Sequence, residues 1–152
     1  MKLNQEKMLM TKKVFSDIEK TIGSCPPECG GVLGAGEDGI VTAYYFDHTG
    51  EHSERGYAPD VKEINHVLEE EWMPRGLYMV GLVHSHENGV GVPSCMDVGY
   101  GIRILQALDT VNVLYLPIVT LSENGMKMDV HMVCRDPERG FSCKSIPVEV
   151  LG

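Results

Sequence analysis

Apolar residues recur along the chain at regular intervals, and the interval predicts the element that each segment forms. Near the N-terminus the apolar positions lie mostly four apart, which predicts one amphipathic helix over about residues 4–22. The residues of this stripe are Met8, Met10, Val14, Ile18 and Ile22. The prolines at 26–27 end the segment, because proline cannot continue a helix. Residues 61–73 repeat the helical spacing, and Pro74 ends this second helix.

Strand-like segments account for much of the remaining chain. The runs GGVLGAG and GIVTAYYF flank the turn residues Glu37-Asp38-Gly39, which predicts a β-hairpin. Residues 77–86 form an apolar run that predicts a strand, and an amphipathic helix is expected from Ser94 to about Leu108. Three more strands are expected in VNVLYLPIVT, MKMDVHMVC and KSIPVEVL, whereas the polar residues 47–60 predict a loop or a sheet edge. We find no internal repeat, low-complexity segment or linker, so we expect a single domain over residues 1–152.

Composition and charge narrow the classes of function. The 152 residues include 13 basic and 22 acidic side chains, which gives a formal net charge of −9. Such a surface repels phosphate and argues against a nucleic-acid partner, whereas a basic protein or tail is favoured. The sequence shows no signal-peptide pattern and no membrane-spanning run of about 20 apolar residues, so we expect a cytoplasmic protein without a membrane partner. Its five cysteines are expected to stay reduced in that compartment.

The most informative segment is HSHENGVGVPSCMD, residues 84–97. His84 and His86 are two apart at the end of a predicted strand, so both imidazoles point to the same side and can face one metal ion. Asp97 follows in the first turn of the next helix, where it offers a third, anionic ligand. Two histidines and one carboxylate leave a fourth position for water, a pattern typical of catalytic zinc sites. Zinc lowers the pKa of such a water to about 7.

Each part of this segment also has a purely structural interpretation. Ser94 and Asp97 have nearly the spacing of a helix capping box, and two histidines on a strand are more often surface residues than ligands. A nucleophilic Cys95 paired with one histidine would leave the other histidine and Asp97 without a role. The conjunction of all these residues at these offsets favours the metal site.

Other patterns favour structure over chemistry. Residues 34–39 spell GxGxxG, but a strand pattern follows instead of the helix that a dinucleotide site needs. Four cysteines lack the usual spacing of a zinc knuckle and are expected to be separate thiols. These are Cys25, Cys29, Cys134 and Cys143. The histidines expected not to be ligands are His48, His52, His66 and His131.

The motif resembles the signature of the JAMM (MPN-plus) metallopeptidase family: an upstream Glu, then His-Ser/Thr-His, seven residues, Ser, two residues and Asp. The segment His84-Ser85-His86, Ser94 and Asp97 match it position for position, and Pro27-Glu28-Cys29-Gly30-Gly31 looks like the Glu segment. The resemblance spans nearly the whole chain and is to bacterial single-domain members. It implies an α/β fold in which a curved, mixed or antiparallel β-sheet is flanked by helices, a cytidine-deaminase-like architecture. Glu87 is a departure, since many relatives have proline there.

The same resemblance implies roles for the site residues. Zinc would be the cofactor, bound by His84, His86 and Asp97. Glu28 would act as general base on the zinc-bound water and then pass the proton to the leaving amine. Ser94 would donate a hydrogen bond to the developing oxyanion.

The activity implied by the resemblance is hydrolysis of a peptide or isopeptide bond after the C-terminal glycine of a ubiquitin-like or sulfur-carrier protein. Such a deubiquitinase-like enzyme would work alongside E1/E2-like conjugation enzymes. The alternative is a non-catalytic MPN-type scaffold, although scaffolds of this kind typically lack one or more ligands. A third interpretation, a DNA-repair-associated relative of the same fold, conflicts with the net charge of −9 if it is to bind DNA directly.

Overall fold

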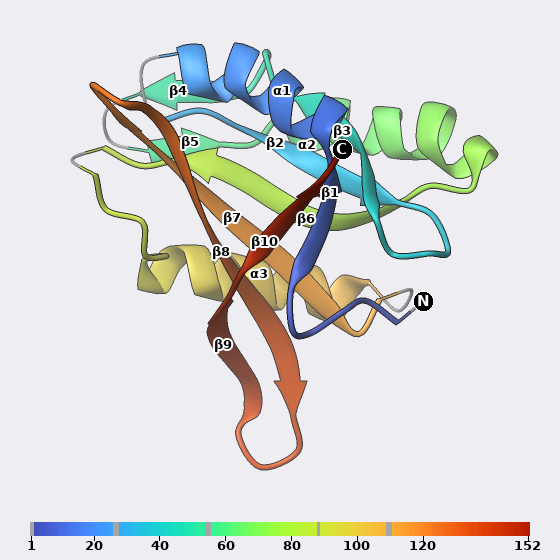
Figure 1. Cartoon of the computed structure of the whole chain (residues 1–152). Coiled ribbons are helices and arrows are strands. Elements are labelled where there is room, and N and C mark those ends of the chain that lie inside the picture. Colours follow the sequence, from blue (N-terminus) through green and yellow to red (C-terminus); the bar gives the residue numbers. More distant parts are fainter. Residues whose placement is uncertain (1, 26–27, 54–55, 88, 109–110) are drawn as a thin grey trace.

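A sheet of eight strands forms the centre of the molecule, with a separate two-stranded hairpin beside it (Figure 1). The structure is a computed structural model, and it describes residues 2–25, 28–53, 56–87, 89–108 and 111–152. The strands of the large sheet are β1 (Met8–Thr11), β2 (Gly30–Ala35), β3 (Val41–Phe46), β6 (Tyr78–Ser85), β7 (Val113–Ser122), β8 (Gly125–Asp136), β9 (Gly140–Ile146) and β10 (Val148–Leu151). Those of the hairpin are β4 (Glu51–Ser53) and β5 (Gly56–Ala58).

The large sheet is mixed and curved. Its order is β10-β1-β3-β2-β6-β7-β8-β9. The pairs β1–β10, β1–β3 and β6–β7 are parallel, and the others are antiparallel. Strands β9 and β10 follow one another across Pro147, so the chain that leaves one edge of the sheet forms the opposite edge (Figure 1). This confirms the expected α/β fold with a curved mixed sheet flanked by helices.

Helices cover both faces of the sheet (Figure 1). The α-helices are α1 (Lys12–Lys20), α2 (Val61–Val67) and α3 (Cys95–Ala107). Helices α1 and α2 lie on one side and α3 on the other. Helix α2 continues as a π-helical turn, η2 (Leu68–Trp72), and a 3-10 turn, η3 (Met73–Arg75), so the helical segment predicted over 61–73 is confirmed. Among the described residues, no helix has the length and apolar character needed to cross a membrane.

The single helix expected over residues 4–22 is wrong in its first half. Met8 and Met10 are fully buried and alternate with partly exposed neighbours, so this stretch has the period of a strand. It pairs with β10 on one side and β3 on the other. Helix α1 begins only after Thr11, whose side-chain oxygen accepts a hydrogen bond from the Val14 amide and caps the helix. A short 3-10 turn, η1 (Ile22–Ser24), follows it.

The remaining helices and strands predicted from the sequence are confirmed, with two refinements. Residues 34–39 belong to the β2–β3 hairpin and not to a nucleotide-binding turn. Pro147 divides the strand expected in KSIPVEVL into β9 and β10, since proline cannot donate to a sheet ladder. The 47–60 region, expected to be a loop or an edge, contains the β4–β5 hairpin.

Candidate metal and catalytic site

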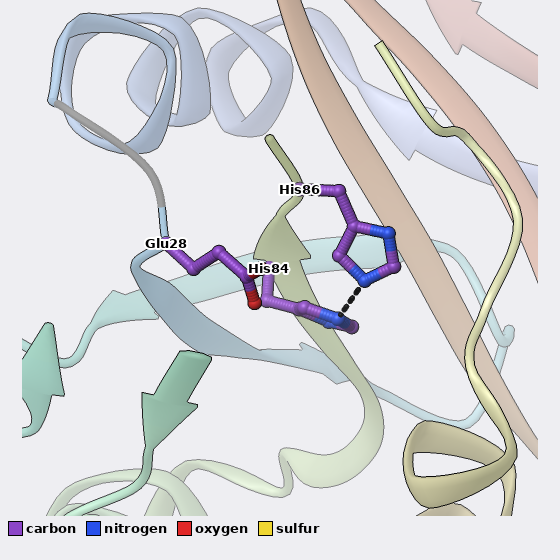
Figure 2. Close-up of side chains that lie close together, drawn as sticks. All are labelled: Glu28, His84 and His86. Carbon is purple, nitrogen blue, oxygen red and sulfur yellow. Dashed lines mark hydrogen bonds between the residues drawn. The ribbon is translucent and has the colours of Figure 1, made fainter. Parts of the chain in front are cut away.

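The two histidines of the motif converge at the end of β6. His84 is buried within the strand, and His86 follows directly after it, so both side chains emerge on the same side. Their Nε2 atoms lie 2.9 Å apart, and the rings meet edge to face (Figure 2). The structure therefore brings the two imidazoles to one point, as the spacing predicts.

Asp97 reaches the same point from the first turn of α3. Its Oδ2 lies 3.0 Å from His86 Nε2, and its Oδ1 lies 3.3 Å from His84 Nε2. The carboxylate is held by a capping box, in which Ser94 N donates to Asp97 Oδ2 at 2.8 Å and Asp97 N donates to Ser94 Oγ at 3.1 Å. The capping interpretation of Ser94 is thus correct, and the cap orients the carboxylate towards the histidines.

This constellation fits a small divalent cation. Bonds of about 2.0–2.1 Å in a tetrahedron place ligand atoms about 3.3 Å apart. The three separations between the ligand atoms of His84, His86 and Asp97 are 2.9, 3.0 and 3.3 Å. Two ring nitrogens and a carboxylate are also a donor set that suits zinc.

The protonation of His86 is fixed from its other side. Its Nδ1 lies 2.9 Å from the backbone oxygen of Val90, and only the nitrogen can donate in that pair. In the neutral ring Nε2 therefore carries the lone pair and points to the metal position. The hydrogen bond with Asp97 raises the pKa of His86 above its ordinary value. Burial opposes ionisation of Asp97, but the hydrogen bonds with both histidines hold its pKa below the ordinary range.

Glu28 lies beside the histidines on the segment that leads into β2 (Figure 2). A carboxylate oxygen of Glu28 and one ring nitrogen from each of His84 and His86 all lie within 4.8 Å of one another. Among the described residues, its carboxylate has no hydrogen-bond or ion-pair partner. A carboxylate in this state is available to accept a proton from water.

The backbone next to Glu28 is tied to the histidine motif itself. The buried Ser85, between the two histidines, donates its amide to Cys29 O at 2.9 Å, and its Oγ accepts from Cys29 N at 3.0 Å. These two bonds fix the position of Glu28 relative to the histidines. Burial raises the pKa of Cys29 to about 11, so its thiol stays protonated at neutral pH.

A cleft of about 810 Å³ opens at this cluster. Its wall includes β5 and the residue after it, the loop that follows His86, and the first turns of α3. The lining comprises Glu28, Tyr57, Ala58, Pro59, Leu82, His84, His86, Glu87, Val90, Val92, Pro93, Ser94, Met96, Asp97, Tyr100 and Leu116. All five residues predicted from the sequence therefore face one cleft.

Sequence reasoning missed the residues that support this cleft. Tyr57 packs so closely on Gly30 that a Cβ at residue 30 would overlap its ring. The Tyr57 hydroxyl donates to the buried Asp47 Oδ2 at 2.6 Å, and Asp60 N donates to the same oxygen at 2.9 Å. Burial, and then the hydrogen bond to Asp47, raise the pKa of Tyr57 far above its ordinary value, so the hydroxyl stays protonated. The polar composition of 47–60 gave no indication of this bond.

Fold and site together define an α/β domain with a candidate metal centre. The family model described as prokaryotic homologs of the JAB domain matches residues 17–131, more than half of the chain. The chain therefore belongs to the JAMM/MPN family, through its prokaryotic JAB branch.

Solved structures support the same fold. A protein from Desulfitobacterium hafniense, determined in solution, aligns with a TM-score of 0.63 at 19% identity over 95% of this chain and 94% of its own. A JAB1/MPN domain protein from Archaeoglobus fulgidus aligns with a TM-score of 0.50 at 16% identity over 97% of this chain and 100% of its own. No curated protein matches the chain.

Proposed function

We propose that the protein is a zinc-dependent peptidase that cleaves a peptide or isopeptide bond after the C-terminal glycine of a ubiquitin-like or sulfur-carrier protein. The observation that carries the proposal is the convergence of His84, His86 and Asp97 on one point, with Glu28 beside them in a cleft. The JAMM/MPN family is often metallohydrolytic, although its prokaryotic members include non-catalytic ones.

The three converging side chains would hold zinc. When bound, zinc supplies a Lewis acid that makes water more acidic and polarises the scissile carbonyl. His84, His86 and Asp97 supply three ligands and leave one side of the site open to the cleft.

Glu28 would take the proton from the attacking water and deliver it to the leaving amine. A carboxylate with no hydrogen-bond or ion-pair partner among the described residues, next to both ligating nitrogens, suits both transfers. Ser94 would stabilise the charge that develops on the carbonyl oxygen. Its Oγ uses a lone pair to accept from Asp97 N, so its own O–H remains free to donate.

The cleft supports a flexible, basic tail as the substrate. Its charged lining residues within the described chain, Glu28, Glu87 and Asp97, are all acidic. An extended tail can lie along a strand edge and gain backbone hydrogen bonds, and glycines let its backbone approach the reacting centre. The conjugation enzymes that attach such tails are the proposed functional partners.

The competing proposal is a scaffold that binds the same kind of tail without cleaving it. The experiment measures zinc content and the cleavage of fusions with Gly-Gly, Ala-Ala or Val-Val before the scissile bond. We expect about one zinc per chain and cleavage after Gly-Gly. Equal cleavage of all three fusions would reject the tail model, and zinc binding without any cleavage would support the scaffold.

Glu28→Gln is the matched catalytic control. It should keep zinc and the fold, because Glu28 is not one of the proposed ligands, and lower kcat by about 10²–10⁴. A Glu28→Gln protein with nearly wild-type kcat would show that another group is the base.

A further inference from the structure

We propose that His131 is a positioning residue for the proposed metal centre. It acts through residues 90–92, the loop segment that orients His86. The inference rests on the proposed metal function, but it concerns a residue outside the motif. His131 lies on β8, and its contact with this loop joins residues 40 positions apart.

Two successive carbonyl groups connect His131 to His86. His131 Nε2 donates to the backbone oxygen of Gly91 at 2.8 Å. The preceding carbonyl, that of Val90, accepts the hydrogen bond from His86 Nδ1 at 2.9 Å. The peptide that His131 holds is therefore adjacent to the one that fixes the His86 ring.

Strand β8 makes a second contact with the same residue of the loop. Asp129 and His131 are two apart on the strand, so their side chains share one face. A Cβ at residue 91 would overlap the Asp129 carboxylate, which means that the glycine backbone lies directly on that side chain. Asp129 and His131 therefore both contact Gly91 from the same face of β8.

Apolar packing contributes little to fixing the position of the loop segment 90–92. Val90 is 51% exposed and Val92 is 63% exposed, so neither side chain is anchored in the core. A segment with few buried apolar contacts opens readily unless polar contacts restrain it. The hydrogen bond from His131 is therefore a main restraint on the Val90 carbonyl.

The hydrogen bond from His131 therefore helps to set the tautomer and the orientation of the His86 ring. A ligating histidine that donates its second N–H to a fixed carbonyl has its tautomer and orientation set, and loss of such a partner typically costs 10–100-fold in metal affinity. The Val90 carbonyl cannot be removed by mutation. His131 is the side chain through which it can be released.

The test uses two polar substitutions that differ in reach. The amide nitrogen of His131→Gln falls near the position of the histidine Nε2, whereas that of His131→Asn falls near Nδ1 and is too short to contact Gly91. His66→Asn is the matched control, because His66 is an exposed residue of α2. The zinc dissociation constant is measured by competition with a chromophoric chelator, and folding by the melting temperature without zinc. Long-range ¹H–¹⁵N correlation spectra report the tautomer of His86.

We expect His131→Asn to raise the zinc dissociation constant about 10–100-fold and to mix the His86 tautomers. His131→Gln and His66→Asn should stay close to wild type. A folded His131→Asn protein with wild-type zinc affinity and an unchanged His86 tautomer would overturn the inference, as would equal losses in the Gln and Asn variants. If the wild-type protein binds zinc but cleaves no fusion, the proposed peptidase activity fails and the zinc measurements still test His131. If it binds no zinc at all, both proposals fall.

Discussion

At the scale of single residues, the Ser94 hydroxyl has an observed capping role and a proposed catalytic role, and separate measurements distinguish the two. It accepts a hydrogen bond from Asp97 N as the cap of α3, and Ser94 lines a cleft where we propose that an oxyanion forms. Ser94→Ala removes both. We expect a loss of about 1 kcal/mol in the free energy of unfolding and a fall in kcat larger than the rise in KM, because an oxyanion contact acts mainly in the transition state.

Thr11→Ala is the control for this variant. Thr11 caps α1 in the same way, with its hydroxyl accepting from Val14 N, but it does not line the cleft. It should lose similar stability at unchanged kcat. If Ser94→Ala behaves like Thr11→Ala in both measurements, Ser94 is only a cap.

Sequence patterns predicted which residues of the candidate site lie together, but not which residues support them. His84, His86, Ser94 and Asp97 lie within fourteen positions, so strand and helix periodicity suffices to place them together. The bonds from Tyr57 to Asp47 and from His131 to Gly91 depend on how distant segments pack. Neither follows from local spacing.

At the scale of elements, a hydrogen bond from Tyr57 joins the β4–β5 hairpin to Asp47. Tyr57→Phe removes the hydroxyl that donates to Asp47 at 2.6 Å. We expect the free energy of unfolding to fall by about 1.5–3 kcal/mol, as for bonds to charged groups. Because the hairpin forms one wall of the cleft, KM for the fusion substrate should also rise while zinc content stays constant.

Tyr44→Phe provides the comparison. Tyr44 is a partly buried tyrosine on β3, and its hydroxyl lies 2.7 Å from Thr21 Oγ, away from the cleft. Melting curves and kinetics on both variants should show a loss of stability in each and a rise in KM only for Tyr57→Phe. An unchanged KM in Tyr57→Phe would mean that the hairpin does not contact the substrate.

The secondary-structure elements also show where predictions from local sequence patterns fail. In the first 22 residues, Met8 and Met10 fit a helical stripe nearly as well as a strand, and the stretch is a strand because it pairs at Met10 with β3 and over its whole length with β10. Strand β10 comes from the other end of the sequence. The β2–β3 hairpin, by contrast, was predictable because Glu37-Asp38-Gly39 joins neighbouring strands and Gly39 has a positive φ of 74°.

At the scale of the whole molecule, the proposed metal would join β6 to α3. A ligand that binds only the folded state stabilises it by about 4 kcal/mol at a free concentration 1,000 times its dissociation constant. For a chain of this size we expect zinc to raise Tm by about 8–16 °C and a chelator to reverse the change. A His84→Ala, His86→Ala double variant should show no dependence of Tm on zinc, and full zinc retention in that variant would refute the ligand assignment.

For the proposed basic-tail substrate, the net charge of −9 should have a measurable effect on KM. Glu87→Gln removes one negative charge from the cleft lining, and Glu138→Gln removes one from an exposed turn between β8 and β9. For a tail that carries arginine before its glycines, Glu87→Gln should raise KM about two- to fivefold, the range of an exposed charge pair. Added salt should reduce that difference. Equal KM values for the two variants would argue against electrostatic selection of the tail.

The parallel pairing of β1 with β10 joins two strands that are synthesised at different times. Residues 8–11 emerge from the ribosome long before their partners at 148–151. Until then β1 has only its contact with β3 and is itself the edge strand, with which another chain can pair. The site residues are all synthesised long before β10 pairs with β1. A nascent chain can therefore carry the complete proposed metal-binding motif while one side of β1 is still unpaired, which makes this interval the one in which the protein most needs protection from aggregation.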